Sequence, residues 1–306
     1  MAGLVNFAPA DLGGSIRPRS GRKPRFRGGC RFLSALVLVI VAYGGAASPG
    51  LAADPTFNIK DVDDATATKF KAEFQSRKET LERYLIDTSF APVFSGPIDV
   101  EVSADGPSFS EALLFAWDGR RGHSYFPAAR VKQGKAAITH ELMHVNAPNE
   151  VRFLAEGFPT YVEDKIGNVK AYPLAGHHIA CGIQAYDRIY TKALDAVNFV
   201  SFDATPTKHG LRLGDGMGLE PAFPKSKNGI EWRRDYAYLV SASFVKFLIE
   251  GYGLDKFKAL YNLTPLTPGQ SAKADPGRYQ QSIGKPIDEL QSEWRVWLPG
   301  QKRSCH

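Results

Sequence analysis

Apolar side chains recur at intervals near 3.6 residues in several stretches of this chain, the spacing of one face of a helix. The first such stretch, residues 64–86, predicts a long amphipathic helix, and Asp64 is a residue type that can cap its start. A second stretch, 233–253, is more strongly apolar and closes with glycine. Two shorter helices are expected in 253–263 and 286–298.

Between these stretches the pattern changes to short segments rich in branched or aromatic residues. Three of them, 97–103, 111–117 and 122–128, are separated by Gly, Asp, Ser and Pro, which predicts a small mixed or antiparallel sheet. The helical pattern returns in 134–146. Pro148 is expected to end that helix and Asn149 to cap the next one.

The order of these elements predicts an α+β fold with a mainly helical second half. Residues 54–306 are expected to form a single domain, with a helix, the sheet and the motif-bearing helices in 54–170 and the helical half in 171–306. A Gly- and Pro-rich stretch, 208–229, is long enough for a loop that borders a cleft.

The net charge of +6 suggests an anionic partner until the charges are located. Residues 1–53 carry seven Lys or Arg side chains and one acid, so this leader holds the whole excess and the remainder is balanced. A balanced body excludes a large basic surface of the kind that binds nucleic acid.

The leader has the features of an export signal. A basic stretch precedes the apolar run "FLSALVLVIVAYGGAA", and small residues follow, so cleavage is expected near Ala53. The run is shorter than the ~20 residues of a membrane-spanning helix. We expect a periplasmic or secreted protein, and an N-terminal membrane anchor if the leader is not cleaved. After cleavage Cys181 and Cys305 remain, either as one disulfide or as two separate thiols.

The sequence "HELMH" places His140 and His144 four residues apart, with Glu141 directly after the first. Residues i and i+4 lie on one face of a helix, so both imidazoles can bind one ion. A catalytic zinc site uses three protein ligands and leaves a position open, and an adjacent glutamate can act as general base. The alternative is a solvated acidic helix.

The third ligand distinguishes classes of zinc hydrolase. Metzincins need glycine and histidine where this chain has Ala147 and Glu150, so that class is excluded. Glu156, within "FLAEGFPTYVED", has apolar neighbours, and a buried carboxylate is costly without a partner. Pro159 predicts that Glu156 approaches from a kinked or newly started helix.

The segments "HELMH" and "LAEGFPTYVE" together resemble the gluzincin zinc metallopeptidases, and within them the peptidase MA-like group. The segment "RDYAYLVSASFVKFLIEGYGLDKFKALYN" resembles a downstream helix of that group, so the likeness spans roughly residues 65–265. The resemblance implies a thermolysin-like architecture, zinc as the cofactor and a peptide or protein substrate. It assigns His140, His144 and Glu156 as zinc ligands and Glu141 as the general base.

The same resemblance implies a tyrosine that stabilises the oxyanion, and two residues compete for this role. Tyr238 fits the register of the family best, and Tyr236 is the alternative. On a helix the two positions lie about 200° apart, so they cannot both face the metal. Ordinary core packing explains either residue equally well.

Other polar residues are weaker candidates. His177 and His178 can line a cleft or lie in a surface loop, and His123 can stand near the site or be structural. Arg233 and Arg234 can hold a substrate carboxylate or begin a solvated helix.

Two functions are compatible with these observations. The first is an exported zinc-dependent peptidase-like hydrolase, in which zinc and Glu141 activate water. The second is a non-catalytic envelope or interaction protein that retains a gluzincin scaffold. Glu141 favours the enzyme, because zinc binding alone does not need it.

Overall fold

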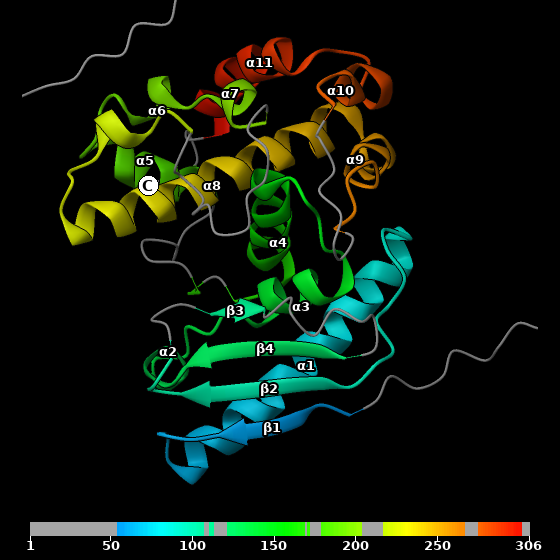
Figure 1. The fold of residues 1–306 in the computed structure, drawn as a ribbon, viewed down its shortest axis with the longest axis vertical. Coiled ribbons are helices and arrows are strands. Elements are labelled where there is room, and N and C mark those ends of the chain that lie inside the picture. Colours follow the sequence, from blue (N-terminus) through cyan, green and yellow to red (C-terminus); the bar gives the residue numbers. More distant parts are fainter. Residues whose placement is uncertain are drawn as a thin grey trace, which may run out of the picture. The chain divides into compact units, whose positions relative to one another are not determined.

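The structure, a computed structural model, describes residues 54–106, 110–112, 121–168, 170–171, 179–203, 217–266 and 275–301. All of them lie in one compact unit, Pro49–His306. The expected leader, His177, His178, Cys305 and the end of the second expected strand lie outside the described residues. In chain order (Figure 1), the elements are β1 (Thr56–Ile59), α1 (Asp64–Thr88), β2 (Ile98–Ser103), β3 (Glu111–Ala112), β4 (Gly122–Pro127), α2 (Ala128–Lys132), α3 (Ile138–Asn146), α4 (Arg152–Ile166), α5 (Ile179–Asp187), α6 (Ala193–Ala196), α7 (Phe199–Asp203), a 3₁₀ turn (Glu220–Ala222), α8 (Lys227–Tyr252), α9 (Leu254–Tyr261), α10 (Gly277–Ser282) and α11 (Ile287–Gln301).

In the described residues the sheet has the strand order β1-β2-β4-β3. β1 pairs parallel with β2, and β2 pairs parallel with β4; only the short β3 runs antiparallel to β4. The sequence predicted a mixed or an antiparallel sheet. The mixed sheet is confirmed, and the antiparallel one is wrong because two of the three described strand pairs are parallel. One of the two parallel pairs involves β1, which the pattern did not reveal: α1 carries the chain back to the start of β2, as a parallel connection requires.

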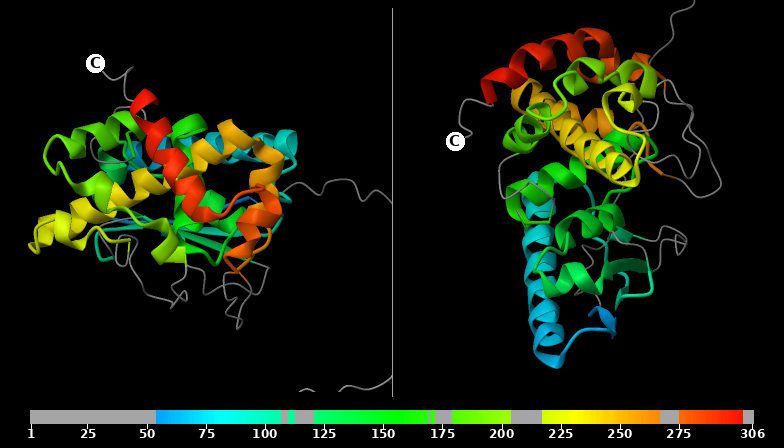
Figure 2. Two further views of the ribbon diagram at one scale, coloured as in Figure 1. Left: turned by 90° about the horizontal axis from the view of Figure 1, so that it is seen from above. Right: turned by 90° about the vertical axis from the view of Figure 1, so that its left-hand side faces the viewer.

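Helix α1 covers one face of this sheet (Figure 2) through aromatic side chains. The Phe74 ring lies 5.5 Å from that of Phe57 on β1, and the Phe70 ring lies 5.4 Å from that of Phe126 on β4 (centroid distances). The cap of α1 is Asp63 and not Asp64: its carboxylate accepts the backbone N–H of Thr66 at 2.8 Å. The helix expected in 64–86 is present and two residues longer.

The helices that carry the motif start later than the pattern predicted. α3 begins at Ile138, because the chain turns at Gly134, whose φ of 63° favours glycine. α4 begins at Arg152 with Val151 at its N-cap, so Asn149 is not the cap. Asn149 instead accepts the N–H of Val151 and fixes the turn before the helix.

Pro159 lies inside α4, which runs unbroken from Arg152 to Ile166. Of the kinked or newly started helix expected for Glu156, the second holds, because α4 begins only one turn before it. Proline removes one donor, the N–H that would bond to Ala155, and the rest of the helix continues. The next residue, Thr160, donates its hydroxyl to the carbonyl of Glu156 at 2.8 Å.

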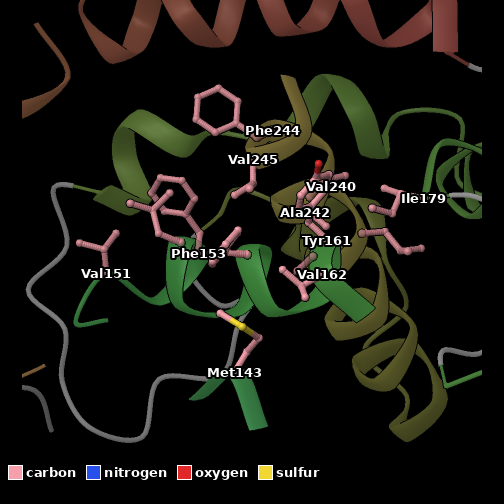
Figure 3. Close-up of a cluster of buried hydrophobic side chains, with 14 of the residues drawn as sticks. Met143, Val151, Phe153, Tyr161, Val162, Ile179, Val240, Ala242, Phe244 and Val245 are labelled. Carbon is pink, nitrogen blue, oxygen red and sulfur yellow. The ribbon is translucent and has the colours of Figure 1, made fainter. Parts of the chain in front are cut away.

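Helix α4 packs closely on α8, and Figure 3 shows their buried side chains meeting beside Met143 of α3. Phe153 and Val162 of α4 and Val240 and Phe244 of α8 are almost fully buried. The closest approach is at Gly157, where an added Cβ would lie 2.8 Å from the carbonyl carbon and oxygen of Ser241. The glycine thus permits a contact of backbone against backbone.

The rest of the second half is helical, as predicted. α8 ends where Gly253 adopts a φ of 94°, and α9 and α11 correspond to the two shorter helices expected. Among the described residues, no helix has the length and apolar character needed to cross a membrane. Cys181 on α5 is disulfide-bonded. Its pairing with Cys305 stays a prediction, since Cys305 lies outside the described residues.

Candidate metal centre

Helices α3 and α4 bring three side chains together at one point. The Nε2 atom of His140 lies 3.0 Å from Nε2 of His144 and 3.1 Å from Oε2 of Glu156. The same Glu156 oxygen lies 3.3 Å from Nε2 of His144. His140 and Glu156 are 4% and 3% exposed, and His144 is partly exposed, so the cluster opens toward solvent on one side.

This triangle of atoms fits a zinc ion. Zinc bonds to imidazole nitrogen and carboxylate oxygen at about 2.0–2.2 Å in a tetrahedron, whose ligand atoms are then about 3.3–3.5 Å apart. The three observed separations, 3.0 to 3.3 Å, are close to this value. In the tautomer with its proton on Nδ1, each neutral imidazole presents a lone pair on Nε2, so all three atoms can bind one cation. The donor set has three ligands and one open position, which is the pattern of a catalytic site.

Glu141 lies on α3 between the two histidines and is 3% exposed. Glu156 raises the pKa of Arg152 and burial raises that of Tyr238, and the negative charge of Glu141 adds to both shifts. Glu141 therefore belongs to the same buried group of charges.

Arg152, at the start of α4, holds the other oxygen of Glu156. Its Nη2 atom lies 2.8 Å from Oε1 of Glu156, one helical turn further on. Burial by itself raises the pKa of Glu156, but Arg152, His144 and the hydrogen bonds from the two imidazoles outweigh it and hold that pKa well below the usual value. The carboxylate is thus kept ionised, with Oε2 directed at the histidines.

His140 is held in place by α4 at three atoms. Its Nε2 faces Glu156, its Nδ1 lies 3.4 Å from the hydroxyl of Thr160, and its backbone N–H donates to Oε2 of Glu163 at 2.6 Å. Burial lowers the pKa of His140 to about 4, although the hydrogen bond to Glu156 opposes the shift. The imidazole therefore stays neutral at ordinary pH, as a metal ligand must.

The two tyrosines face different parts of the protein. The Tyr238 ring lies 5.8 Å from that of His140 (centroid distance), and burial followed by the charge of Glu156 raises the pKa of its hydroxyl. The Tyr236 hydroxyl donates to Asp187 of α5 at 2.9 Å. Of the two, Tyr238 lies beside the metal cluster with its hydroxyl protonated and able to donate.

Of the other candidates, those in the described residues do not join the metal cluster. His123 lies on β4, with Nε2 3.7 Å from Oε2 of Glu101 on the neighbouring strand. Arg234 forms an ion pair of 3.5 Å with Asp235. α8 begins at Lys227, so Arg233 and Arg234 lie beyond its first turn and not at the helix start expected for them.

Sequence reasoning missed three residues of the site: Arg152, Thr160 and Glu163. Arg152 lies four residues before Glu156, Thr160 four after it and Glu163 seven after it. Residues at these spacings lie on one face of a helix. That periodicity was the available signal. It is hard to use across Pro159, which normally ends a helix.

No family model matches the chain, and no curated protein matches it. Among solved structures it is similar to a mutant M1 zinc metallopeptidase from Deinococcus radiodurans bound to a Tyr-Ser-Ala substrate, at 16% identity and a TM-score of 0.35, over 82% of this chain and 46% of that one. Another structure of that mutant gives 16% identity and a TM-score of 0.38, over 80% and 47%. A two-domain M1 zinc metallopeptidase mutant bound to L-arginine gives 14% and 0.36, over 80% and 47%. The chain thus spans about half the length of the solved structures it matches.

Proposed function

We propose that this protein is a zinc-dependent hydrolase of the peptidase type. The single observation that carries the proposal is the convergence of His140, His144 and Glu156 to within 3.0–3.3 Å of one another, with Glu141 buried beside them. A peptide or protein substrate is proposed from the resemblance of the sequence to gluzincins. The thermolysin-like arrangement is part of the same proposal.

His140, His144 and Glu156 would hold the zinc, which supplies a Lewis acid that polarises the scissile carbonyl and an attacking water. Glu141 takes a proton from that water as it attacks and can pass it to the leaving amine. The Tyr238 hydroxyl donates a hydrogen bond to the carbonyl oxygen, which gains negative charge in the transition state. Arg152 keeps Glu156 ionised and in position throughout.

The experiment separates metal binding from chemistry. The protein is loaded with zinc, freed of excess metal, and measured by elemental analysis and by digestion of a peptide library. We expect one zinc per chain in the wild type and none in His140→Ala. Glu141→Gln should keep the zinc and lose ~10²-fold or more of any hydrolysis, since it removes the general base.

A matched control is Glu101→Gln, which changes a carboxylate on β2 and should leave both readouts unchanged. Wild-type protein without stoichiometric zinc would reject the site. Full hydrolysis by Glu141→Gln would reject the mechanism, and zinc without hydrolysis of any peptide would leave the non-catalytic scaffold.

We also propose that the protein is exported, because the whole positive excess and the apolar run precede residue 54. The mature chain is then expected to begin near Asp54, outside the cytoplasm. N-terminal sequencing of the fractionated protein tests this. Recovery of the unprocessed chain alone, in the cytoplasm, would contradict export, and its recovery in the membrane fraction would indicate an anchor.

A further inference from the structure

The first turn of α3 has no cap of its own. The residue at its N-cap is Ala137, whose side chain has no acceptor for the free N–H groups that follow. The segment is buried: Ala136, Ala137 and Ile138 are all under 9% exposed, so water cannot easily replace a cap. An acceptor from elsewhere in the protein is therefore needed, because a buried unpaired N–H is costly.

Glu163 of α4 supplies that acceptor. Its Oε2 atom accepts the backbone N–H of His140 at 2.6 Å, and its side chain is fully buried. His140 is the third residue of α3, the position whose N–H an N-cap side chain normally binds. A carboxylate there also interacts favourably with the positive end of the helix dipole. Glu163 thus acts as the cap of α3 from 23 residues away in the sequence.

The second oxygen of Glu163 ties the same helix start to the end of α4. Oε1 accepts the backbone N–H of Asn168 at 2.5 Å. The Asn168 side chain in turn donates to the carbonyls of Gly134 and Ala136, at 2.9 and 3.3 Å. Gly167 makes room for this arrangement, since an added Cβ would lie 2.6 Å from the Glu163 carboxylate. Glu163 therefore binds the start of α3 directly, and through Asn168 it is also linked to the turn that precedes α3.

We propose that Glu163 is a positioning residue for the metal ligand His140. Glu156, Thr160 and Glu163 form one stripe along α4, and they contact His140 at Nε2, Nδ1 and the backbone N respectively. Glu156 faces the proposed ligand atom of His140, and Thr160 orients the imidazole ring. Glu163 holds the His140 backbone and so fixes where on α3 the side chain begins. This inference rests on the proposed metal site and adds a residue that would not touch the metal, the substrate or the water.

A purely structural role for Glu163 predicts a different result. A buried carboxylate that only stabilises the fold lowers stability when it is changed, but the molecules that remain folded bind metal as before. A positioning residue affects the metal itself, and outer-shell partners of metal ligands typically contribute 10–100-fold in affinity. The zinc affinity of the folded protein is therefore the readout that separates the two roles.

The test compares Glu163→Gln with the wild type and with Asp203→Asn. Glutamine has the shape of glutamate but presents one acceptor and one donor, so one of the two N–H groups loses its partner. Asp203→Asn is the control, because it makes the same change of acid to amide at another buried side chain, on α7 rather than α4. Zinc affinity is measured by competition with a chelator under conditions where all three proteins are folded, and the Co²⁺-substituted forms are compared by their visible absorption.

We expect Glu163→Gln to bind zinc ~10–100-fold more weakly and to show an altered Co²⁺ spectrum. Asp203→Asn should match the wild type in both. If Glu163→Gln does not fold, Gly167→Ala serves in its place, since the added methyl group displaces the same carboxylate. Unchanged affinity and spectrum in the Glu163 variant, or in Gly167→Ala when it is the one measured, would overturn the proposal.

The outcome is separable from that of the proposed function. Zinc binding by the wild type without any hydrolysis would reject the peptidase and leave the positioning role intact. Failure of the wild type to bind zinc or Co²⁺ would overturn both. Normal hydrolysis together with an unaltered Glu163→Gln site would overturn the positioning role alone.

Discussion

Two buried clusters of charged side chains in the described residues differ in the groups that they bring together. On α7 and α10, Asp203 accepts from the guanidinium of Arg278 and from the Tyr279 hydroxyl. On α3 and α4, two imidazole nitrogens and one carboxylate oxygen face one another at 3.0–3.3 Å. The first cluster pairs a carboxylate with a guanidinium, and the second gathers three side chains that could bind a metal ion.

Burial and charge alone therefore do not identify a functional site. Both carboxylates, Asp203 and Glu156, are 3% exposed. Burial raises the pKa of Asp203 above its ordinary value despite Arg278, whereas the pKa of Glu156 is held well below it. What distinguishes the candidate metal centre is the convergence of three possible metal ligands, and the predictions below test that contrast in order of decreasing effect.

The largest effect is expected from Asp203→Asn. This change leaves Arg278 buried without its counter-charge, and breaking a buried ion pair costs about 3–5 kcal/mol. The equivalent change in the metal cluster, Glu156→Gln in zinc-free protein, should cost less, since its partner Arg152 has a side chain 38% exposed that water can solvate. Urea denaturation of both variants measures the difference. Equal losses would show that the two clusters are stabilised alike.

Zinc should stabilise one cluster only. At a free zinc concentration 100 times its Kd, binding to the folded chain raises the free energy of unfolding by about 2.7 kcal/mol. Asp203→Asn should keep the whole increment, and Glu156→Gln should lose most of it. Thermal unfolding with zinc and with a chelator provides the measurement. An increment that survives in Glu156→Gln would place the metal elsewhere.

The two tyrosines of α8 repeat the contrast on a smaller scale. Tyr236→Phe removes the hydrogen bond to Asp187 and should cost about 1 kcal/mol of stability without affecting turnover. Tyr238→Phe should lower turnover ~10²-fold or more at unchanged zinc content, if its hydroxyl stabilises the transition state. Steady-state kinetics and denaturation of both variants test this. If Tyr236→Phe lowered turnover and Tyr238→Phe did not, Tyr236 and not Tyr238 would be the residue that stabilises the transition state.

The last prediction concerns a single proton, the one that the imidazole of His140 binds. Burial lowers the pKa of His140 from 6.5 to about 4, so in zinc-free protein its imidazole should remain neutral at pH 5. The unfolded chain binds this proton at the higher pH, so the contribution of His140 to stability is lost as pH falls from about 6.5 to about 4. NMR titration of the imidazole nitrogens measures it. A midpoint near 6.5 would mean that the cluster is open to water.

The long helices and the pairing of His140 with His144 on one helix face were predictable from sequence, because each depends on local spacing. α1 and α8 have apolar positions that repeat with the helical period, and Gly253 marks where α8 ends. The ligands His140 and His144 need only a helix beneath them. Tyr238 and Tyr236 could be separated by rotation on a helix, but which of them faces α3 depends on how α8 packs.

What sequence did not reveal depends on contacts between distant segments. β1 is four residues long and alternates only weakly in burial, so the parallel unit that it forms with α1 and β2 was missed. The spacing of Glu163 from Glu156 places the two on one face of a helix, but it does not reveal the partner of Glu163, which is the backbone of another helix. Pro159 suggested a break in α4 and so obscured the face on which Arg152, Thr160 and Glu163 lie.

The contact between Gly157 and Ser241 has a consequence for the dimensions of the site. Gly157 directly follows Glu156, and Ser241 lies three residues after Tyr238, so the contact lies next to both proposed site residues. A side chain at position 157 would meet the Ser241 carbonyl, so α4 and α8 would have to move apart at this point. The distance between the Glu156 carboxylate and the Tyr238 hydroxyl in the proposed mechanism therefore depends on a glycine that touches neither group.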